Sequence, residues 1–143
     1  AISYFYETIN LTHFDKSHPF YNAPISKENL TQLNAMTNYI LEKKKSGIDV
    51  IVLSYEAAIY MVPLQLNHGA LDLLLAGNLG YNGISNTIEQ ISQMQNTEFL
   101  IFTNAEDCFY QEPIEIREYI QNYLKKSGEF LDYSIYINES FML

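Results

Sequence analysis

Residues 49–54 read DVIVLS and residues 98–103 read EFLIFT, and these two stretches decide the predicted fold. Each is a short apolar run of mainly β-branched or aromatic residues, a composition typical of a strand that is buried on both faces. The residues between such runs carry apolar side chains at helical spacing. Strands that alternate with helices in this way predict an α/β domain whose sheet is mostly parallel.

The longest predicted helix precedes the DVIVLS strand. Ser26 is a candidate N-cap, and the Ser-Gly pair at residues 46–47 is a candidate stop signal. Apolar residues recur between them every three or four positions, at Leu30, Leu33, Met36, Ile40 and Leu41. The three lysines at residues 43–45 would lie in the last turn, where cations complement the helix dipole.

Further strands are expected at residues 4–11, at residues 71–76 (LDLLLA) and at residues 131–137 (LDYSIYI). Further helices are expected at residues 54–61, after the glycine-bearing turn at residues 77–83, and between Pro113 and the Ser-Gly pair at residues 127–128. About five strands joined by right-handed crossovers predict a Rossmann-like three-layer α/β/α sandwich. No linker or repeat divides residues 1–143, which we therefore expect to form a single domain.

The charge of the chain argues against several partners. Its 143 residues include 17 acidic and 8 basic side chains, giving a net charge of −9. We therefore expect no nucleic acid partner and no docking onto an anionic membrane surface, because both need a surplus of Lys and Arg. We also expect no direct membrane insertion, because no apolar stretch approaches the roughly 20 residues that span a bilayer. The single cysteine, Cys108, cannot form an intrachain disulfide.

Ser54, Glu56 and His68 are the candidate catalytic residues. In open α/β sheets ligands bind beyond the carboxyl ends of the strands, which is where Ser54 and Glu56 would lie. Ser54 lacks the flanking glycines of a nucleophile elbow, so a serine that caps the following helix is the alternative interpretation. His13, His18 and His68 show no H-E-x-x-H or similar spacing, and we expect neither a metal site nor a cofactor.

A glycine-bearing turn after residues 71–76 is the candidate ligand-binding loop. Gly77, Asn78, Gly80, Asn82 and Gly83 lie in a G-x-x-G-x-x-G pattern before a predicted helix. Such a loop can point backbone N–H groups at an anion, and Asn78 could serve as an oxyanion donor. The pattern is neither a dinucleotide fingerprint nor a P-loop, and glycine and asparagine also favour ordinary turns.

The first 21 residues are rich in aromatic side chains: Tyr4, Phe5, Tyr6, Phe14, Phe20 and Tyr21. They are expected either to pack on the domain's own sheet or to form a partner surface, and the sequence leaves both interpretations open. An acidic loop, with Glu106, Asp107 and Glu112 around Cys108, is expected to be a solvated loop rather than a cation site.

The order of segments, with DVIVLSYEAAIYM, LDLLLAGNLG and TEFLIFTN followed by LKKSGE and LDYSIYI, resembles one group of proteins. These are the soluble C-terminal domains that follow the transmembrane helices of some bacterial polytopic envelope proteins, including glycosyltransferase-like ones. The resemblance implies a location on the extracytoplasmic face of a bacterial membrane, with the chemistry in the membrane part. It carries over no site residue, and the sequence itself leaves a cytoplasmic location open.

The chain begins with Ala1 inside an apolar run, so we expect a piece of a longer protein, although removal of an initiator Met is an alternative. The expected function is a non-enzymatic accessory or binding domain of a larger bacterial envelope membrane protein. Its expected partner is the membrane-embedded remainder of the same chain or another protein. The alternative is a small hydrolase or transferase, or a phosphate-ligand binder, that uses the carboxyl ends of the strands.

Overall fold

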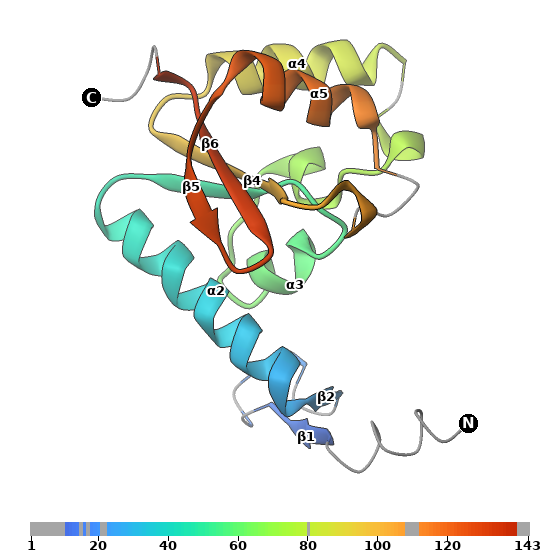
Figure 1. Cartoon of the computed structure of the whole chain (residues 1–143). Coiled ribbons are helices and arrows are strands. Elements are labelled where there is room, and N and C mark those ends of the chain that lie inside the picture. The colour runs from blue at the N-terminus through green and yellow to red at the C-terminus, as the bar shows by residue number, and fades with distance from the viewer. Residues whose placement is uncertain are drawn as a thin grey trace.

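The computed structural model describes residues 11–14, 16, 18–20, 23–79, 81–107 and 112–139. Within them the strands are β1 (Leu11–His13), β2 (Pro24–Ser26), β3 (Asp49–Val52), β4 (Thr97–Phe102), β5 (Lys125–Phe130) and β6 (Tyr133–Ile137). The helices are α2 (Lys27–Lys45), α3 (Ala57–Met61), α4 (Gly83–Gln93) and α5 (Ile114–Tyr123), with the 3₁₀ turns η1 (Gly69–Leu73), η2 (Ala76–Asn78) and η3 (Ala105–Asp107). Figure 1 shows a sheet with helices on both sides, and a separate pair of strands, β1 and β2, at the N-terminal end of α2.

The main sheet is mixed and has four strands in the order β3-β4-β6-β5. Only β3 and β4 run parallel, whereas β6 is antiparallel to both of its neighbours. The prediction of a mostly parallel, Rossmann-like sandwich of about five strands is therefore wrong. What the structure has is a small α/β domain with a mixed sheet.

The predicted strand at residues 71–76 is one source of this error. Residues 69–73 form η1, and Leu71 and Leu74 are buried there without joining the sheet. A six-residue apolar run has no clear period, and Leu and Asp are not strand-favouring residues. Burial of such a run therefore does not require a strand.

The C-terminal hairpin is the other source. The predicted helix end at residues 127–128 is wrong, because α5 ends at Tyr123 and residues 125–130 form β5. Only Leu131 and Asp132 separate β5 from β6. A two-residue connection joins antiparallel strands, whereas a parallel pair needs a crossover of a dozen residues or more.

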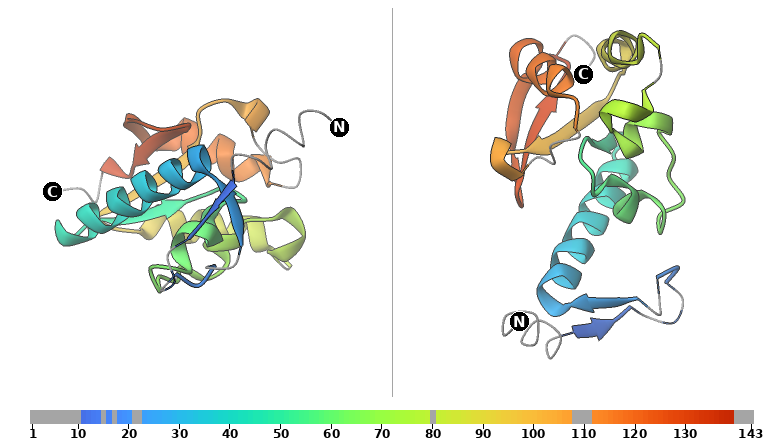
Figure 2. Two further views of the ribbon diagram at one scale, coloured as in Figure 1. Left: turned by 90° about the horizontal axis from the view of Figure 1, so that it is seen from below. Right: turned by 90° about the vertical axis from the view of Figure 1, so that its right-hand side faces the viewer.

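The helices lie on both faces of the sheet. Figure 2 shows α2 and α3 on one side and α4 and α5 on the other. Alternate residues of β3, together with Leu53, which follows it, divide between the two cores: Val50 and Val52 face α2 and α3, and Ile51 and Leu53 face α4 and α5. This division follows from the period of two along a strand.

Helix α2 confirms the strongest local predictions. The Ser26 side chain accepts a hydrogen bond from the backbone N–H of Asn29 at 3.1 Å, and the helix ends at Lys45. Phe14 is buried against this helix side of the core, and Phe20 packs next to it. The earlier aromatic residues and Tyr21 lie outside the described residues, as does Cys108.

No helix among the described residues is both long enough and apolar enough to cross a bilayer.

Candidate functional site

The carboxyl end of the parallel pair is the first place to look for a site. Ser54 follows β3, and Thr103 follows β4. Tyr133 reaches the same edge from the opposite direction, because antiparallel β6 begins with Tyr133 opposite Phe102 at the end of β4. The antiparallel direction of β6 therefore brings Tyr133 to the carboxyl end of the parallel pair. A parallel β6 would have placed this first residue of the strand at the opposite end of the sheet.

Four side chains form a closed hydrogen-bond network here, which we call the rim network: Ser54, Glu56, Tyr60 and Tyr133. The Tyr133 hydroxyl donates to Oε2 of Glu56 at 2.7 Å, and the Tyr60 hydroxyl donates to the same oxygen at 3.0 Å. Oγ of Ser54 lies 3.0 Å from Oη of Tyr133 and accepts the backbone N–H of Glu56 at 3.2 Å. Because the one Tyr133 proton goes to the carboxylate, the Ser54 hydroxyl is the donor to Tyr133.

Three of the four residues of the rim network are buried, and Glu56 is partly exposed. Ser54 is 0% exposed, and Tyr133 and Tyr60 are buried on the α3 side of the sheet. Burial raises the pKa of Tyr133 and of Tyr60 far above the usual value of 10.0, and the carboxylate of Glu56 raises both further. Both phenols are therefore neutral donors throughout the physiological pH range.

This arrangement does not activate Ser54. A nucleophilic serine needs a base that accepts its proton, and the partner of the Ser54 hydroxyl is instead a neutral phenol. Its other hydrogen bond holds the turn that leads from β3 into α3, since the carbonyl of Ser54 also accepts the N–H of Ala57. Ser54 and Glu56 thus have structural roles in this turn.

His68 lies at the opposite end of β3. Its Nε2 is 3.9 Å from Oδ2 of Asp49, the first residue of that strand. Asp49 and Ser54 are five residues apart along an extended chain, which corresponds to about 16 Å. Among the described residues no hydrogen bond connects His68 with the rim network, so the predicted catalytic residues do not form one group.

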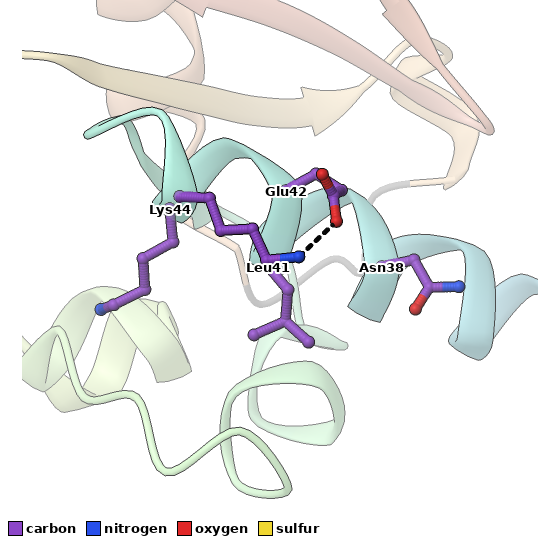
Figure 3. A pocket seen from close by; sticks show the side chains of 5 residues that line it. Asn38, Leu41, Glu42 and Lys44 are labelled. Carbon is purple, nitrogen blue, oxygen red and sulfur yellow. Dashed lines mark hydrogen bonds and ion pairs between the residues drawn. The ribbon is translucent and has the colours of Figure 1, made fainter.

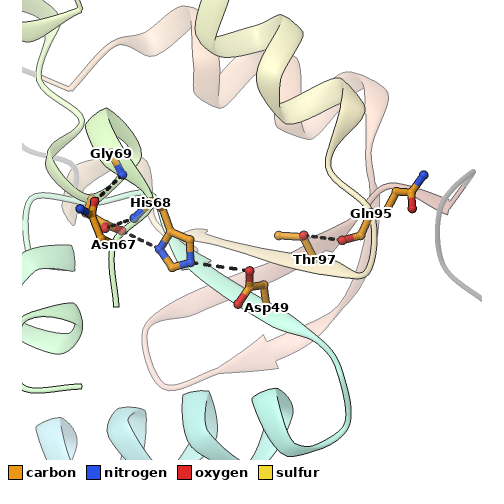
Figure 4. A network of polar contacts seen from close by, with 7 residues as sticks. Asp49, Asn67, His68, Gly69, Gln95 and Thr97 are labelled. Atoms are coloured by element: carbon orange, nitrogen blue, oxygen red, sulfur yellow. Dashed lines mark hydrogen bonds and ion pairs between the residues drawn. The ribbon is translucent and has the colours of Figure 1, made fainter. Parts of the chain in front are cut away.

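The contacts of His68 form a second polar group, the His68 cluster, which consists of Asp49, His68 and Asp72. Figure 4 shows His68 beside Asp49. Nδ1 of His68 lies 2.9 Å from Oδ1 of Asp72, and the backbone N–H of His68 donates to Oδ2 of Asp72 at 2.6 Å. Asn67 accepts the N–H of Gly69 at 2.8 Å. These bonds hold the turn that precedes η1.

The glycine-bearing loop does not form a phosphate cradle in the part that the structure describes. Residues 76–78 form η2, and Gly80 and the side chain of Asn78 are outside the description. Asn82 has φ +56° and makes no side-chain hydrogen bond as the N-cap of α4. A Cβ on Gly83 would lie 2.3 Å from Cβ of Leu79, so this glycine allows the close packing of Leu79.

Two shallow hollows lie elsewhere on the surface. One of about 380 Å³ is lined only by residues of α2: Asn38, Leu41, Glu42, Lys44 and Lys45 (Figure 3). The other, of about 310 Å³, is lined by Asp49 with Lys44, Gly47, Ile48, Gln95 and Asn96. Neither hollow includes a residue of the rim network.

A buried ion pair was missed by the sequence reasoning. Glu98 in β4 has a side chain only 7% exposed, and it accepts hydrogen bonds from Lys43 at 2.9 Å and from Tyr39. Lys43 also lies over the Tyr39 ring, 5.4 Å from its centroid. Burial and the Glu98 carboxylate raise the pKa of Tyr39 far above its usual value. The available signal was a glutamate inside the apolar EFLIFT strand, which needs a cationic partner when buried.

Among the residues that the structure describes, no group of three or more His, Cys, Asp or Glu side chains is placed to hold a metal ion. No family model, no curated protein and no solved structure matches this chain.

Proposed function

We propose that this chain is a non-enzymatic binding domain, an accessory part of a larger bacterial envelope membrane protein. The rim network is the observation that supports a domain without enzymatic activity. Its serine and carboxylate are hydrogen-bonded to buried neutral tyrosines, and the histidine is at the other end of β3. The envelope context rests on the resemblance in segment order, and it places the domain on the extracytoplasmic face of the membrane.

The outer face of α3 is the best candidate for the binding surface. Tyr55, Ile59 and Val62 are between 43% and 50% exposed. Ile59 in α3 and Val62 at its C-cap are three residues apart, which places them on one side of the helix, and Tyr55 comes just before the helix. Leu73, 46% exposed, is on η1, which packs against α3. We call these four residues the α3 surface. Exposed apolar side chains gathered on one face are typical of interaction sites.

The partner that fits this surface is a protein. A chain with a net charge of −9 is repelled by nucleic acids and by anionic lipid surfaces, which removes the two common non-protein partners. The apolar side chains supply the contact area for a protein partner, which is either the membrane-embedded remainder of the chain or a separate subunit. The hydrolase, transferase and phosphate-binder hypotheses have no specific observation among the described residues in their favour.

A serine-reactive probe tests the non-enzymatic part of the proposal. We expect a fluorophosphonate to label the folded protein and its Ser54→Ala variant equally, because Ser54 is buried and has no base. Labelling of the wild type at Ser54 that is lost in Ser54→Ala would contradict the proposal.

Site-specific photo-crosslinking tests the binding part. A photoreactive residue at Ile59 or Val62 of the natural full-length protein should crosslink in cells to one defined protein segment. The same residue at Leu41, which is 40% exposed on α2, serves as the matched control and should not give that product. Equal products from all three positions would show that the α3 surface is not the interface.

A further inference from the structure

His68 is held between two carboxylates from different parts of the chain. Asp72 lies one turn further along the chain in η1, and Asp49 begins β3. The His68 side chain is only 9% exposed and that of Asp72 13%, whereas the Asp49 side chain is 50% exposed. The Asp72 carboxylate is therefore on the buried side of the imidazole, and the Asp49 carboxylate is on the side that faces solvent.

The hydrogen bond to Asp72 determines which ring nitrogen is available. An ionised carboxylate can only accept, so the 2.9 Å contact places the proton of a neutral imidazole on Nδ1. Nε2 then carries the free lone pair and points toward Asp49 (Figure 4). In this neutral form, Nε2 and Oδ2 of Asp49 are two acceptors that face one another.

The separation of Nε2 and Oδ2 is close to that of two ligands on one metal ion. The 3.9 Å between Nε2 and Oδ2 is too long for a hydrogen bond. Two ligands on one tetrahedral zinc ion, each bound at about 2.1 Å, lie about 3.4 Å apart. A small rotation of the half-exposed Asp49 side chain closes that difference. Asp49, but not His68, borders the hollow of about 310 Å³, and its side chain is 50% exposed, so water can reach this carboxylate from solvent.

We propose that Nε2 of His68 and the carboxylate of Asp49 bind one divalent transition-metal ion of the zinc class, against the sequence expectation of no metal. Water completes the coordination, since no third His, Cys, Asp or Glu joins them among the described residues. Asp72 acts as a positioning residue that orients the imidazole, the arrangement in which metal-bound histidines are commonly held. Lys44 lines the same hollow, and the two carboxylates outweigh its charge.

The ligand set also predicts selectivity. An imidazole and a carboxylate bind divalent ions with affinities that rise from Mn²⁺ through Co²⁺ and Ni²⁺ to Cu²⁺, with Zn²⁺ below Cu²⁺. Mg²⁺ and Ca²⁺ prefer oxygen ligands only. We therefore expect Zn²⁺ and Ni²⁺ to bind and Mg²⁺ not to compete. The site is independent of the α3 surface and of the proposed function.

The test is a titration of chelator-treated protein with ZnCl₂, followed by calorimetry and by the ¹⁵N chemical shifts of the histidine rings. We expect one ion per chain, with Nε2 of His68 as the ring nitrogen that shifts. Asp49→Asn should abolish binding, and its exposed side chain makes it the variant least able to disturb folding. His18→Gln, which removes another histidine, should leave binding unchanged.

Asp72→Asn keeps both ligands and should weaken zinc binding about 10–100-fold, because it removes the carboxylate that orients the ring. A backbone amide spectrum of each variant checks that it is folded. If Asp72→Asn does not fold, His68→Gln, which removes the nitrogen ligand, is the second variant and should abolish zinc binding. Zinc that shifts another histidine, or binding that survives in Asp49→Asn, would overturn the proposal. No binding of Zn²⁺ or Ni²⁺ at neutral pH would overturn it equally.

Discussion

The hydroxyl of Tyr133 makes two hydrogen bonds inside the protein, donating to Glu56 and accepting from Ser54. Replacement by Phe leaves a buried serine hydroxyl and a carboxylate oxygen with one partner fewer each. We expect Tyr133→Phe to lower the free energy of unfolding by about 1–3 kcal/mol in urea denaturation. Tyr123→Phe, at a ring that is 77% exposed, should change it by less than about 0.5 kcal/mol. Equal small effects would show that the rim network does not stabilise the fold.

The raised tyrosine pKa values predict how stability depends on alkaline pH. Tyr39, Tyr60 and Tyr133 have pKa values raised in the folded protein mainly by burial, whereas in the unfolded chain they titrate near 10. Their contribution is complete below pH 10 and is lost as the pH rises toward the folded values, because the unfolded chain then binds fewer protons.

We therefore expect the free energy of unfolding to fall steeply above about pH 10. Tyrosinate absorbance should show that these three phenols ionise only when the protein unfolds. The variant Tyr60→Phe should reduce the slope of stability against pH in this range. Ionisation of all tyrosines near pH 10 with the fold intact would contradict this account.

At the scale of elements, Glu98 and Lys43 connect α2 to the sheet. Each single substitution, Lys43→Met or Glu98→Gln, leaves a partly buried charge without its partner, so each should destabilise the protein. In the double variant these losses should not add. We expect a coupling free energy of about 0.5–3 kcal/mol from the four unfolding curves. Simple additivity would mean that the ion pair makes no contribution of its own.

The end of α3 offers a test of helix termination. The N–H of Leu66 bonds to the carbonyl of Met61 and that of Gln65 to Val62, with Gln65 at φ +56°. This is the Schellman arrangement, in which glycine is favoured at the left-handed position. Because Gln65 is exposed, Gln65→Gly should stabilise the protein by about 0.5–1 kcal/mol.

The matched control is Gln93→Gly at the exposed last residue of α4, where the backbone is helical. This substitution should destabilise by about 0.5–1 kcal/mol, since glycine has the higher conformational entropy in the unfolded chain. Thermal unfolding of the two variants should therefore shift in opposite directions. A shift in the same direction would refute the assigned helix end.

Helix caps, prolines and the spacing of apolar residues predicted several helices and strands correctly. Ser26, the spacing of apolar residues and the terminal lysines predicted α2, and Pro113 predicted the start of α5. The DVIVLS and EFLIFT runs predicted β3 and β4. Strand β5 was missed because KKSGEF has little apolar content and resembles a helix end, and it is a strand only because it pairs with β6.

At the scale of the whole molecule, strand direction decided which site residues meet. The sequence placed Ser54 and Glu56 at the carboxyl end of β3, and the structure has them there. Tyr133 was not a candidate, because its place at the same edge depends on β6 running antiparallel to β4. The position of His68 depends on the path of residues 62–75 across the sheet edge, which no local pattern specifies.

The antiparallel direction of β6 thus completes the rim network at one end of β3, whereas the path of residues 62–75 places the His68 cluster at the other end. The first supports a binding domain without catalysis, and the second supplies a place for a metal ion. The first conclusion requires that β6 lies antiparallel beside β4 in the register that pairs Leu100 with Ile135.

A nuclear Overhauser spectrum measures this directly. The N–H of Thr103 bonds to the carbonyl of Asp132, so Leu100–Ile135 and Phe102–Tyr133 are the non-hydrogen-bonded pairs, with Cα atoms about 4.5 Å apart. We predict strong Hα–Hα cross-peaks for both pairs. Their absence, with cross-peaks that instead place β6 parallel to β4, would contradict the fold and the rim network that depends on it.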